Sequence, residues 1–461
     1  MKRDRILFLI PPAGRPYSRD RYRTTIIKAC YCWPPLDFLV QSGFLAPQFD
    51  VSVIDTVATR LPPERCRRRI LQLQPAAVFF LTCSASWRED FAFVASLKRD
   101  LPGTRMIAGG GFLLFKGRQV LEASPFLDAV LLSFTTADLR KYLQGEAPSR
   151  NILYRRNGRI VETERACSPD LRIPIPRHDL FPLGKYVYPV LLSNFTVVNT
   201  AVGCPYRCPF CIASGLEYEV RGLDNVMDEL KSVHQFGIRR ILFGDLTFTA
   251  DPARTRELAR RMREARFDFT WMCETRPDLL DRETLQAMKE AGCRAIHLGA
   301  ESGDPRILEQ WKPGLSPARI REAFGLCREL GILTHAYFMI GLPGQEESGI
   351  LQTIAFARSL KPDSVSFNLP MPHPGTAFGA ASDVPEEAFD ERFSFEQATR
   401  RVLEQCSVSP ARLLRLRRRA YAAVYLQPGY WLRAVTRPMS LREAWVSARL
   451  LASLLRTSVL H

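Results

Sequence analysis

The chain has 461 residues, enough for two or three domains, with 46% hydrophobic residues and a formal net charge of +16 at pH 7. No run approaches about 18 consecutive apolar residues, so the sequence predicts no membrane-spanning helix. The short apolar run near the N-terminus ends at Pro11 and Pro12, which favours a buried strand over a signal peptide. Twelve cysteines without an export signal indicate reduced thiols in a cytoplasmic protein, where clustered cysteines suggest metal or redox chemistry.

Residues 1–145 contain short apolar runs that alternate with helix-like segments. This pattern is typical of a parallel sheet with helices on both faces, so we predict an α/β, doubly wound Rossmann-like domain. Ligands of such sheets bind at the carboxyl ends of the strands. The candidates there are Asp55, the small residues 82–86 with Ser84 and Ser86, and Gly109, Gly110 and Gly111, three glycines that either admit a ligand or only form a turn.

Residues 146–190 are rich in Arg and Pro and predict a linker. Six candidate strands follow within 191–385, separated by amphipathic helical patterns. Asp281 and Ser316 are predicted N-caps of two of these helices. Six β/α units indicate a partial parallel barrel, whose active site lies at the C-terminal ends of its strands.

Three cysteines follow the first of these strands with the spacing C-x3-C-x2-C: Cys204, Cys208 and Cys211. A structural zinc site needs four ligands, usually as two pairs, and the chain has no second C-x2-C. Cys273 and Cys293 are isolated and are expected to be buried or incidental. A [4Fe–4S] cluster normally takes four thiolates. With three, one iron keeps an open position that can bind a substrate or cofactor and pass it an electron.

The motif, with the aromatic Phe210 before its last cysteine, resembles the radical S-adenosylmethionine (radical SAM) superfamily. In that family the open iron binds S-adenosylmethionine, and reductive cleavage gives methionine and a 5′-deoxyadenosyl radical. The resemblance implies a [4Fe–4S] cluster on Cys204, Cys208 and Cys211, S-adenosylmethionine as cofactor, and an external electron donor such as flavodoxin or ferredoxin. Further segments match in family order at successive strand ends: 243–249, 274–281, 297–304, 338–345 and 370–376.

The resemblance also points to side chains beyond Phe210 that would contact S-adenosylmethionine. Asp245 would meet the methionine ammonium through a charge-assisted hydrogen bond, or cap the following helix. Arg276 would pair with the methionine carboxylate, or form a structural ion pair. Glu301 and Ser302 would bind the ribose hydroxyls or the methionine end, or form a buried polar pair.

Two glycines complete the expected cofactor site. Gly341 and Gly344 follow the fifth strand, where they would let the adenine approach the backbone or would simply form a turn. The histidines His234, His297 and His335 lack metal-ligand spacing and are expected in core or surface roles.

A doubly wound domain ahead of such a barrel resembles the cobalamin-binding-domain subgroup of radical SAM proteins. Segment 33–46 resembles that subgroup's proline-proline-leucine helix start, and 415–435 its helical tail. Two departures from the subgroup's sequence pattern leave open the alternative that the domain keeps the fold but does not bind cobalamin. Segment 131–139 lacks the subgroup's Gly-Glu-Gly-Glu-like stretch, and no histidine precedes His178 to ligate cobalt. The residues expected to bind cobalamin are Ser84, Ser86, Gly109, Gly110 and Gly111.

Two classes of function are open. The first is a radical SAM enzyme, favoured as a cobalamin-dependent C-methyltransferase on an unactivated carbon of a small-molecule or lipid substrate. The same radical could instead drive cyclisation, oxidation or carbon–carbon bond formation without methyl transfer. The second is a non-catalytic iron–sulfur protein, which the later motifs disfavour because an electron carrier needs no S-adenosylmethionine site.

Residues 386–461 predict a basic C-terminal helical region. From position 411 onward ten arginines stand against one acid, Glu443, and alternate with Leu, Tyr and Trp at helical spacing. Such a helix can lie peripherally on the anionic inner face of the membrane. Alternatively, it can cover the barrel and present a solvated basic face. No nucleic-acid-binding motif is present, so nucleic acid is not an expected partner.

Overall fold

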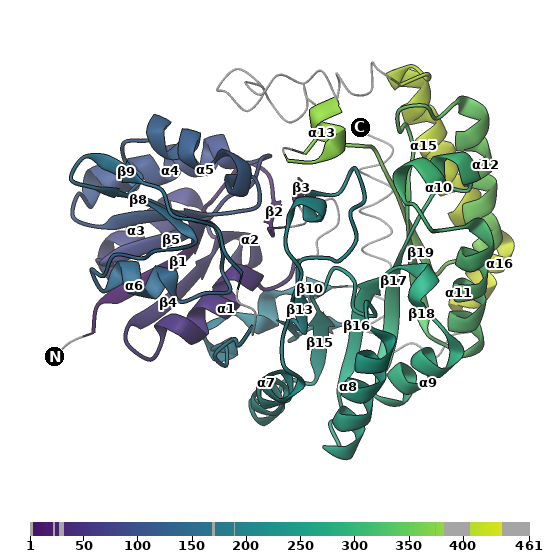
Figure 1. Cartoon of the computed structure of the whole chain (residues 1–461), viewed down its shortest axis with the longest axis horizontal. Coiled ribbons are helices and arrows are strands. Elements are labelled where there is room, and N and C mark those ends of the chain that lie inside the picture. Colours follow the sequence, from purple (N-terminus) through teal and green to yellow (C-terminus); the bar gives the residue numbers. More distant parts are fainter. Residues whose placement is uncertain are drawn as a thin grey trace. The chain divides into compact units, whose positions relative to one another are not determined.

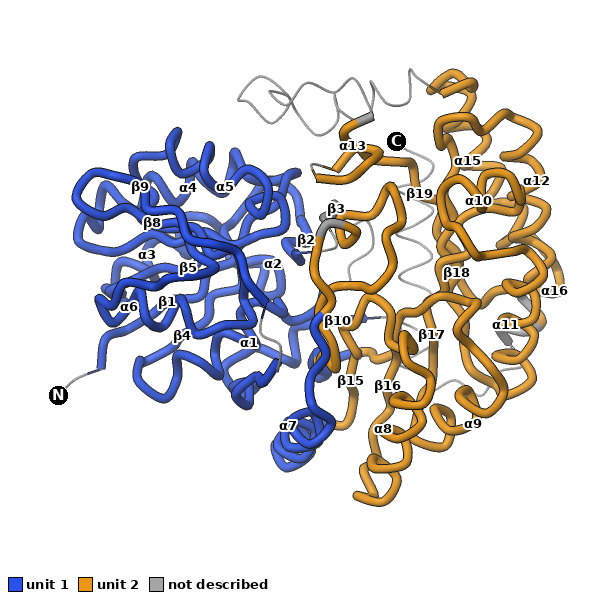
Figure 2. The backbone as a smooth tube through the Cα atoms, viewed as in Figure 1, with its two compact units in different colours: residues 1–188, 193–197, 219–238 blue, residues 189–192, 198–218, 239–461 orange. Residues whose placement is uncertain are grey.

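The structure, a computed structural model, describes residues 3–21, 24–26, 32–167, 171–188, 190–373, 375–381 and 406–435. The chain divides into two compact units (Figure 2). Unit 1 comprises residues 1–188, 193–197 and 219–238, and unit 2 comprises residues 189–192, 198–218 and 239–461. Each unit has its own sheet flanked by helices (Figure 1).

Unit 1 is built on a seven-stranded sheet. Its strands are β1 (Arg5–Ile10), β4 (Asp50–Asp55), β5 (Ala77–Leu81), β6 (Arg105–Gly109), β7 (Ala129–Leu131), β8 (Ile152–Arg156) and β9 (Arg159–Val161). They lie in the order β4-β1-β5-β6-β7-β8-β9, and the first five are parallel, which confirms the predicted doubly wound sheet. The chain reverses its direction of winding between β1 and β5, and such sheets bind ligands at that point.

The other described elements of unit 1 are helices and short strands. The helices are α1 (Leu36–Leu45), α2 (Thr56–Thr59), α3 (Pro63–Leu73), α4 (Trp87–Asp100), α5 (Leu113–Ala123), α6 (Asp138–Leu143) and α7 (Leu223–Gln235), and the short strands are β2 (Tyr17–Arg19), β3 (Thr24–Ile26) and β10 (Val187–Tyr188). Ile70 of α3 and Val94 of α4 pack with Leu7, Val78 and Phe80 of the strands in one buried apolar cluster.

Part of the segment predicted as a linker is folded instead into the first sheet. β7, β8 and β9 form an antiparallel meander within 129–161. Asn157 and Gly158 both have positive φ, 52° and 76°, the conformation that a two-residue hairpin turn requires. The content of Arg and Pro suggested a linker, but the Asn-Gly pair is the local signal that a hairpin forms here.

The predicted barrel sheet has the order β12-β15-β16-β17-β18-β19 and belongs to unit 2, except for the first two residues of β12. These strands are β12 (Thr196–Val198), β15 (Arg240–Phe243), β16 (Thr270–Thr275), β17 (Cys293–Glu301), β18 (Leu333–Met339) and β19 (Ser364–Asn368). β15 to β19 pair in parallel. The intervening helices are α8 (Pro252–Glu264), α9 (Arg282–Glu290), α10 (Pro305–Trp311), α11 (Pro317–Glu329) and α12 (Glu347–Leu360). The expectation of a partial six-stranded barrel is therefore confirmed.

Two predicted helix starts have the expected caps. Asp281 accepts a hydrogen bond from the Thr284 N–H at 2.7 Å, and Ser316 accepts one from the Arg319 N–H at 3.3 Å. Short elements complete the described chain: β11 (Leu192–Ser193), β13 (Ala201–Val202), β14 (Glu219–Val220), α13 (Ala377–Ala381), α16 (Pro428–Val435) and the 3-10 turns His178–Leu180, Leu183–Lys185, Ile212–Gly215 and Pro277–Leu279.

The basic helix α15 (Pro410–Tyr425) packs on the barrel with its apolar face. Leu413, Leu416, Ala420 and Val424 are buried. The phenol oxygens of Tyr421 and Tyr425 accept hydrogen bonds from the N–H groups of Phe367 and Val365 on the edge strand β19. α15 thus covers a sheet edge with its apolar face. This arrangement corresponds to the alternative in which the helix covers the barrel and its arginines form a solvated face.

Residues 386–405 and 436–461 of the predicted basic region lie outside the described residues, and with them Arg437, Arg442, Arg449, Arg456 and Glu443. Among the helices that are described, none is both long and apolar enough to cross a membrane.

Candidate active site

The three-cysteine loop begins directly after β13, at the C-terminal side of the barrel sheet. Gly203 precedes the first cysteine with φ 78°, and a Cβ there would overlap the backbone oxygen of Glu217. The N–H of Cys211 donates to the carbonyl of Cys208 at 3.0 Å, which closes a turn between the last two cysteines. A glycine is therefore required where the chain enters the loop.

The three thiols are free and partly buried. Burial raises the pKa of Cys211 to about 12, and the neighbouring thiols of Cys208 and Cys204 also contribute to raising it. Burial raises the pKa of Cys208 as well, but Lys312 and Arg276 oppose that shift. Two cations thus stand near thiols that would have to ionise to bind iron.

Three thiolates on one short loop, with cations nearby, have the donor chemistry of an iron–sulfur site. Within the part of the chain that the structure describes, however, no three His, Cys, Asp or Glu side chains are close enough together to hold a metal ion. A [4Fe–4S] cluster binds each thiolate to a different iron, so its cysteines need not converge on a single ion. The ligand role of Cys204, Cys208 and Cys211 accordingly stays a prediction.

Phe210 anchors the loop. Its ring packs against an apolar cluster of Ile307, Trp311, Met339, Leu342 and Phe378. The N–H of Phe378, in α13, donates to the carbonyl of Pro209 at 3.0 Å. The aromatic residue before the last cysteine therefore fixes the loop to α10 and α13, and its expected contact with the cofactor stays a prediction.

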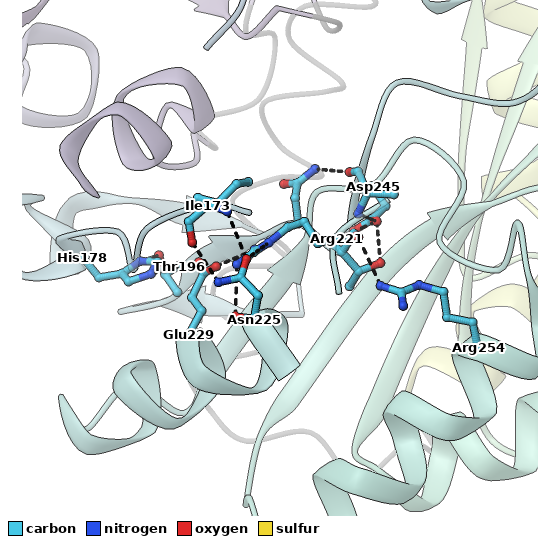
Figure 3. A network of polar contacts seen from close by, with 11 residues as sticks. Ile173, His178, Thr196, Arg221, Asn225, Glu229, Asp245 and Arg254 are labelled. Atoms are coloured by element: carbon cyan, nitrogen blue, oxygen red, sulfur yellow. Dashed lines mark hydrogen bonds and ion pairs between the residues drawn. The ribbon is translucent and has the colours of Figure 1, made fainter. Parts of the chain in front are cut away.

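Asp245 follows β15 and supports the chain just before the cysteine loop. Its carboxylate accepts hydrogen bonds from the Thr200 N–H, from the Thr200 hydroxyl at 2.8 Å and from the Ala201 N–H at 2.6 Å. Arg254 donates to the Thr200 carbonyl nearby (Figure 3). Burial raises the pKa of Asp245 to about 6, although these donors oppose the shift. The carboxylate does not cap the next helix, because Asp251 caps α8.

Arg276 follows β16 and is held from three sides. It donates to both carboxylate oxygens of Asp278, at 3.0 and 2.9 Å, and to the Pro313 carbonyl at 3.3 Å. Its guanidinium carbon lies 4.2 Å from the centre of the Tyr206 ring. The remaining nitrogen, Nη1, lies 3.9 Å from the sulfur of Cys208. The structural ion pair is present, and it aims a charged N–H at a predicted cluster ligand.

Glu301 and Ser302 do not pair with each other. Glu301, with φ 56°, forms an ion pair with Lys312 at 2.8 Å, and Lys312 also donates to the Gly299 carbonyl. The Ser302 hydroxyl lies 3.0 Å from that of Thr353 and accepts a hydrogen bond from a backbone N–H. Both residues are buried, as in the alternative of a buried polar pair, but the bend at Glu301 sends the two side chains to different partners.

Gly341 and Gly344 both adopt positive φ, 85° and 80°. A Cβ on Gly341 would overlap Leu413 of α15, and its N–H donates to Gln345 at 2.8 Å. At Gly344 a Cβ would meet only Gln310, at an ordinary contact distance. The turn conformation accounts for both glycines, and packing against α15 further explains Gly341.

Sequence reasoning missed Lys312, Tyr206 and Thr247. Lys312 pairs with Glu301, Tyr206 stacks on Arg276, and the Thr247 hydroxyl lies 3.3 Å from the Cys204 sulfur. Tyr206 lies inside the cysteine motif and Thr247 inside the matched segment 243–249, so both had a positional signal. Lys312 lies outside every matched segment and comes to the loop only through the barrel fold.

In unit 1 the expected ligand-binding glycines are packed against their own chain. A Cβ on Gly110 would overlap the Thr82 carbonyl, one on Gly111 the Arg21 carbonyl, and one on Gly109 would press on the Phe79 ring. These contacts alone explain the three glycines, so they give no sign of a ligand.

The other candidates at this edge also have structural partners. Asp55 caps α2 and accepts a hydrogen bond from Tyr186, while Ser86 donates to Asp90, which is ion-paired with Arg19. Ser84 is half-buried. A cavity of about 510 Å³ lies at this edge, lined by residues 12–16 after β1 and by residues 56–58 and 60–63 after β4, with Cys32, Lys185 and Val187. Asp55, Ser84 and Ser86 do not line it.

Gly203 allows a direct test of the loop geometry. Gly203 and Gly237 share φ 78°, but a Cβ on Gly237 would meet nothing within 4 Å. We expect Gly237→Ala to cost about 1–2 kcal/mol for the left-handed backbone. Gly203→Ala should cost more and lower the iron bound per chain, because its Cβ must displace the loop. Thermal unfolding and iron analysis measure both; equal losses in the two variants would contradict the prediction.

Comparison with known proteins gives a consistent result. Residues 198–357 match the model of the radical SAM superfamily. An uncharacterized methyltransferase, PH0819 of Pyrococcus horikoshii, is 27% identical over 441 residues, which cover 93% of this chain and 94% of that protein. The anaerobic magnesium-protoporphyrin IX monomethyl ester cyclase of Cereibacter sphaeroides is 26% identical over 78% of this chain and 62% of its own length.

Among solved structures, the radical S-adenosylmethionine methyltransferase TsrM from Kitasatospora setae, with cobalamin and a [4Fe–4S] cluster bound, has a TM-score of 0.65. Its sequence identity is 19%, and the match covers 86% of this chain and 76% of that one. At this identity the likeness shows that both units share the fold of that enzyme.

Proposed function

The chain belongs to the radical SAM superfamily, and we propose that it is a cobalamin-dependent C-methyltransferase acting on an unactivated carbon. The observation that carries the proposal is the C-x3-C-x2-C loop at the C-terminal side of a barrel that follows a doubly wound domain. The end-to-end likeness to a relative named as a methyltransferase supports methyl transfer.

In this proposal Cys204, Cys208 and Cys211 hold a [4Fe–4S] cluster, which supplies the electron for cleavage of S-adenosylmethionine and leaves one iron open for it. Arg276 places an N–H and a positive charge beside the Cys208 sulfur, and Lys312 adds a second charge. These charges offset the negative charge of the thiolates. The protein's remaining task is to orient the cofactor and substrate and to exclude water.

We propose that Asp245, Arg276 and Glu301 chiefly hold the residues around the S-adenosylmethionine site in place and do not bind the cofactor directly. Each already has a strong internal partner: the Thr200 and Ala201 N–H groups, Asp278 and Lys312, respectively. Direct contacts of Ser302, Gly341 and Gly344 with the cofactor remain predictions on the family resemblance.

Cobalamin binding by unit 1 is supported by its strand order and by the fold shared with TsrM. The cavity of about 510 Å³ at its carboxyl edge can admit part of a large ligand. No histidine precedes His178 in the sequence. His178 itself is buried between Thr196 and Glu229, at 2.7 and 3.2 Å. We therefore propose that residues 1–188 supply no imidazole ligand to cobalt.

Reconstitution tests this proposal. Anaerobically loaded protein should retain a corrinoid through desalting, and electron paramagnetic resonance of its Co(II) state should show no nitrogen coupling from a protein imidazole. Hyperfine coupling to a protein nitrogen would contradict the proposal that no imidazole ligates cobalt. Loss of all corrinoid would instead favour radical chemistry without methyl transfer, for which the likeness to the cyclase of Cereibacter sphaeroides is the supporting observation.

The expected partners are a small-molecule substrate and an external electron donor such as flavodoxin or ferredoxin. A peripheral association with an anionic membrane, and with it a lipid substrate, remains a proposal supported by charge alone, because α15 buries its apolar face against the barrel. Co-sedimentation with anionic vesicles at low and high salt tests it, and no pelleting at low salt would dismiss it.

A further inference from the structure

A row of polar side chains crosses the barrel sheet at one level. Glu274 on β16 is in register with His297 on β17, His297 with His335 on β18, and His335 with Ser364 on β19. Tyr337 and Ser366 are in register with each other two residues nearer the C-terminal ends of β18 and β19. We call the six residues the polar rung: Glu274, His297, His335, Tyr337, Ser364 and Ser366.

The polar rung lies on the inner face of the barrel. On the same strands the alternate residues face the outer helices: the Phe338 ring is 6.4 Å from Phe356 of α12, and the Phe367 ring is 5.4 Å from Tyr421 of α15. Successive side chains of a strand point to opposite faces. His335, Tyr337, Ser364 and Ser366 therefore face away from those helices, which lie along one side of the sheet in Figure 1.

Hydrogen bonds join the rung into a network. The Tyr337 hydroxyl donates to Glu274 at 3.3 Å and lies 2.9 Å from Nδ1 of His297. The two nitrogens of His335 lie 2.7 Å from the Ser364 hydroxyl and 3.0 Å from the Ser366 hydroxyl. The rings of His297 and His335 are 4.7 Å apart. Burial and the nearby His297 hold the pKa of His335 well below its usual range, so this imidazole is neutral.

The fold does not require these residues. The interiors of parallel barrels are usually filled by branched aliphatic side chains, and each buried polar group costs free energy unless it is hydrogen-bonded. The chain nevertheless places a carboxylate, two imidazoles, a phenol and two hydroxyls on adjacent inner positions. Such a set exchanges hydrogen bonds readily with hydroxyl and amino groups and gains nothing from a hydrocarbon.

We propose that the polar rung binds a hydroxyl or amino group of the substrate and so holds a target carbon toward the C-terminal ends of the strands. This inference rests on the proposed function and names the class of its substrate: a molecule with a hydrogen-bonding head rather than a bare hydrocarbon. His297 and His335, two of the histidines expected in core or surface roles, thereby acquire a part in substrate recognition.

Two Tyr→Phe variants form a matched pair. Tyr337→Phe removes a rung hydroxyl, and Tyr421→Phe removes an outer hydroxyl that accepts a hydrogen bond from the Phe367 N–H. We expect both purified variants to retain wild-type iron content and wild-type formation of 5′-deoxyadenosine without substrate. If Tyr337→Phe instead lost this basal cleavage, the rung would serve the cofactor and the inference would be overturned.

The substrate arm uses the source organism with the gene deleted, complemented by wild type, Tyr337→Phe, Tyr421→Phe or Cys208→Ala. The metabolite formed by wild type and absent with Cys208→Ala is the product. It should carry a hydroxyl or amino group, and its level should fall about three- to tenfold with Tyr337→Phe, the effect of one lost hydrogen bond, but not with Tyr421→Phe.

Each other result is decisive. Equal product from the two Tyr→Phe strains, or a product with neither group, would overturn the rung as the binding site while leaving the proposed function intact. Indistinguishable metabolites in the wild-type and Cys208→Ala strains would overturn the proposed function, and this inference with it.

Discussion

Replacement of Cys204, Cys208 or Cys211 by alanine is expected to abolish both the bound cluster and the cleavage of S-adenosylmethionine. Wild-type protein reconstituted without oxygen should hold about four irons per chain and turn brown. With only three thiols in the motif, loss of one leaves two ligands, too few to hold the cluster while keeping an iron open. Iron analysis, the visible spectrum and assay of 5′-deoxyadenosine measure the outcome.

The matched control is Cys273→Ala. Cys273 is fully buried in β16, and burial raises its pKa well above the usual value of a thiol, so it stays a neutral side chain of the core. Its loss removes one sulfur atom from the packing and should leave the iron content at the wild-type level. A stable zinc site in anaerobically purified protein, or iron retained by all three motif variants, would refute the cluster assignment.

Much of the fold is predictable because it depends on local patterns. The alternation of apolar runs with amphipathic helices indicates both parallel sheets, and Asp281 and Ser316 cap helices where the sequence predicts. The hairpin turn at Asn157 and Gly158 also has a local signal, which the surrounding arginines and prolines obscured.

The partners of the site residues are less predictable because they depend on which strands become neighbours. Lys312 reaches Glu301, and Arg276 reaches Cys208, across gaps in sequence that no short motif spans. The glycines 109–111 show the converse case. Their pattern is typical of a ligand turn, but a Cβ on them would overlap carbonyls and a ring of unit 1 itself, so packing also explains them and their contact with cobalamin stays a prediction. The polar rung was invisible as a motif because its members are spread over four strands.

Replacement of Glu229 by alanine is expected to lower the free energy of unfolding by about 3–5 kcal/mol, the cost of leaving one partner of a buried ion pair without the other. In unit 1 the Glu229 carboxylate accepts a hydrogen bond from Arg221 at 2.6 Å and lies 3.2 Å from Nε2 of His178 (Figure 3). All three side chains are buried, Arg221 with only 1% of its side chain exposed.

The pH dependence of this variant follows from the same contacts. Burial alone would raise the pKa of Glu229, but Arg221 and His178 outweigh it and hold the pKa below the usual value of 4.5. For an acid with a lowered pKa in the folded state, the stabilisation is fully present above the unfolded pKa and is lost as the pH falls through the folded one. The gap between wild type and Glu229→Ala should therefore be constant at neutral pH and should narrow below about pH 4.

Two further variants separate the effect of burial from that of charge. Glu257 in α8 also pairs with arginines, Arg260 and Arg261, but at the surface, so Glu257→Ala should cost much less than Glu229→Ala. The double variant Arg221→Met/Glu229→Leu removes both buried charges and should recover much of the loss, because well-packed apolar side chains can replace a buried pair. Urea unfolding followed by tryptophan fluorescence compares the four proteins.

If Glu229→Ala costs no more than Glu257→Ala, the buried network contributes no more to the stability of unit 1 than a surface ion pair does. If instead the double variant is no better than the single one, the loss comes from packing around α7 and not from an uncompensated Arg221.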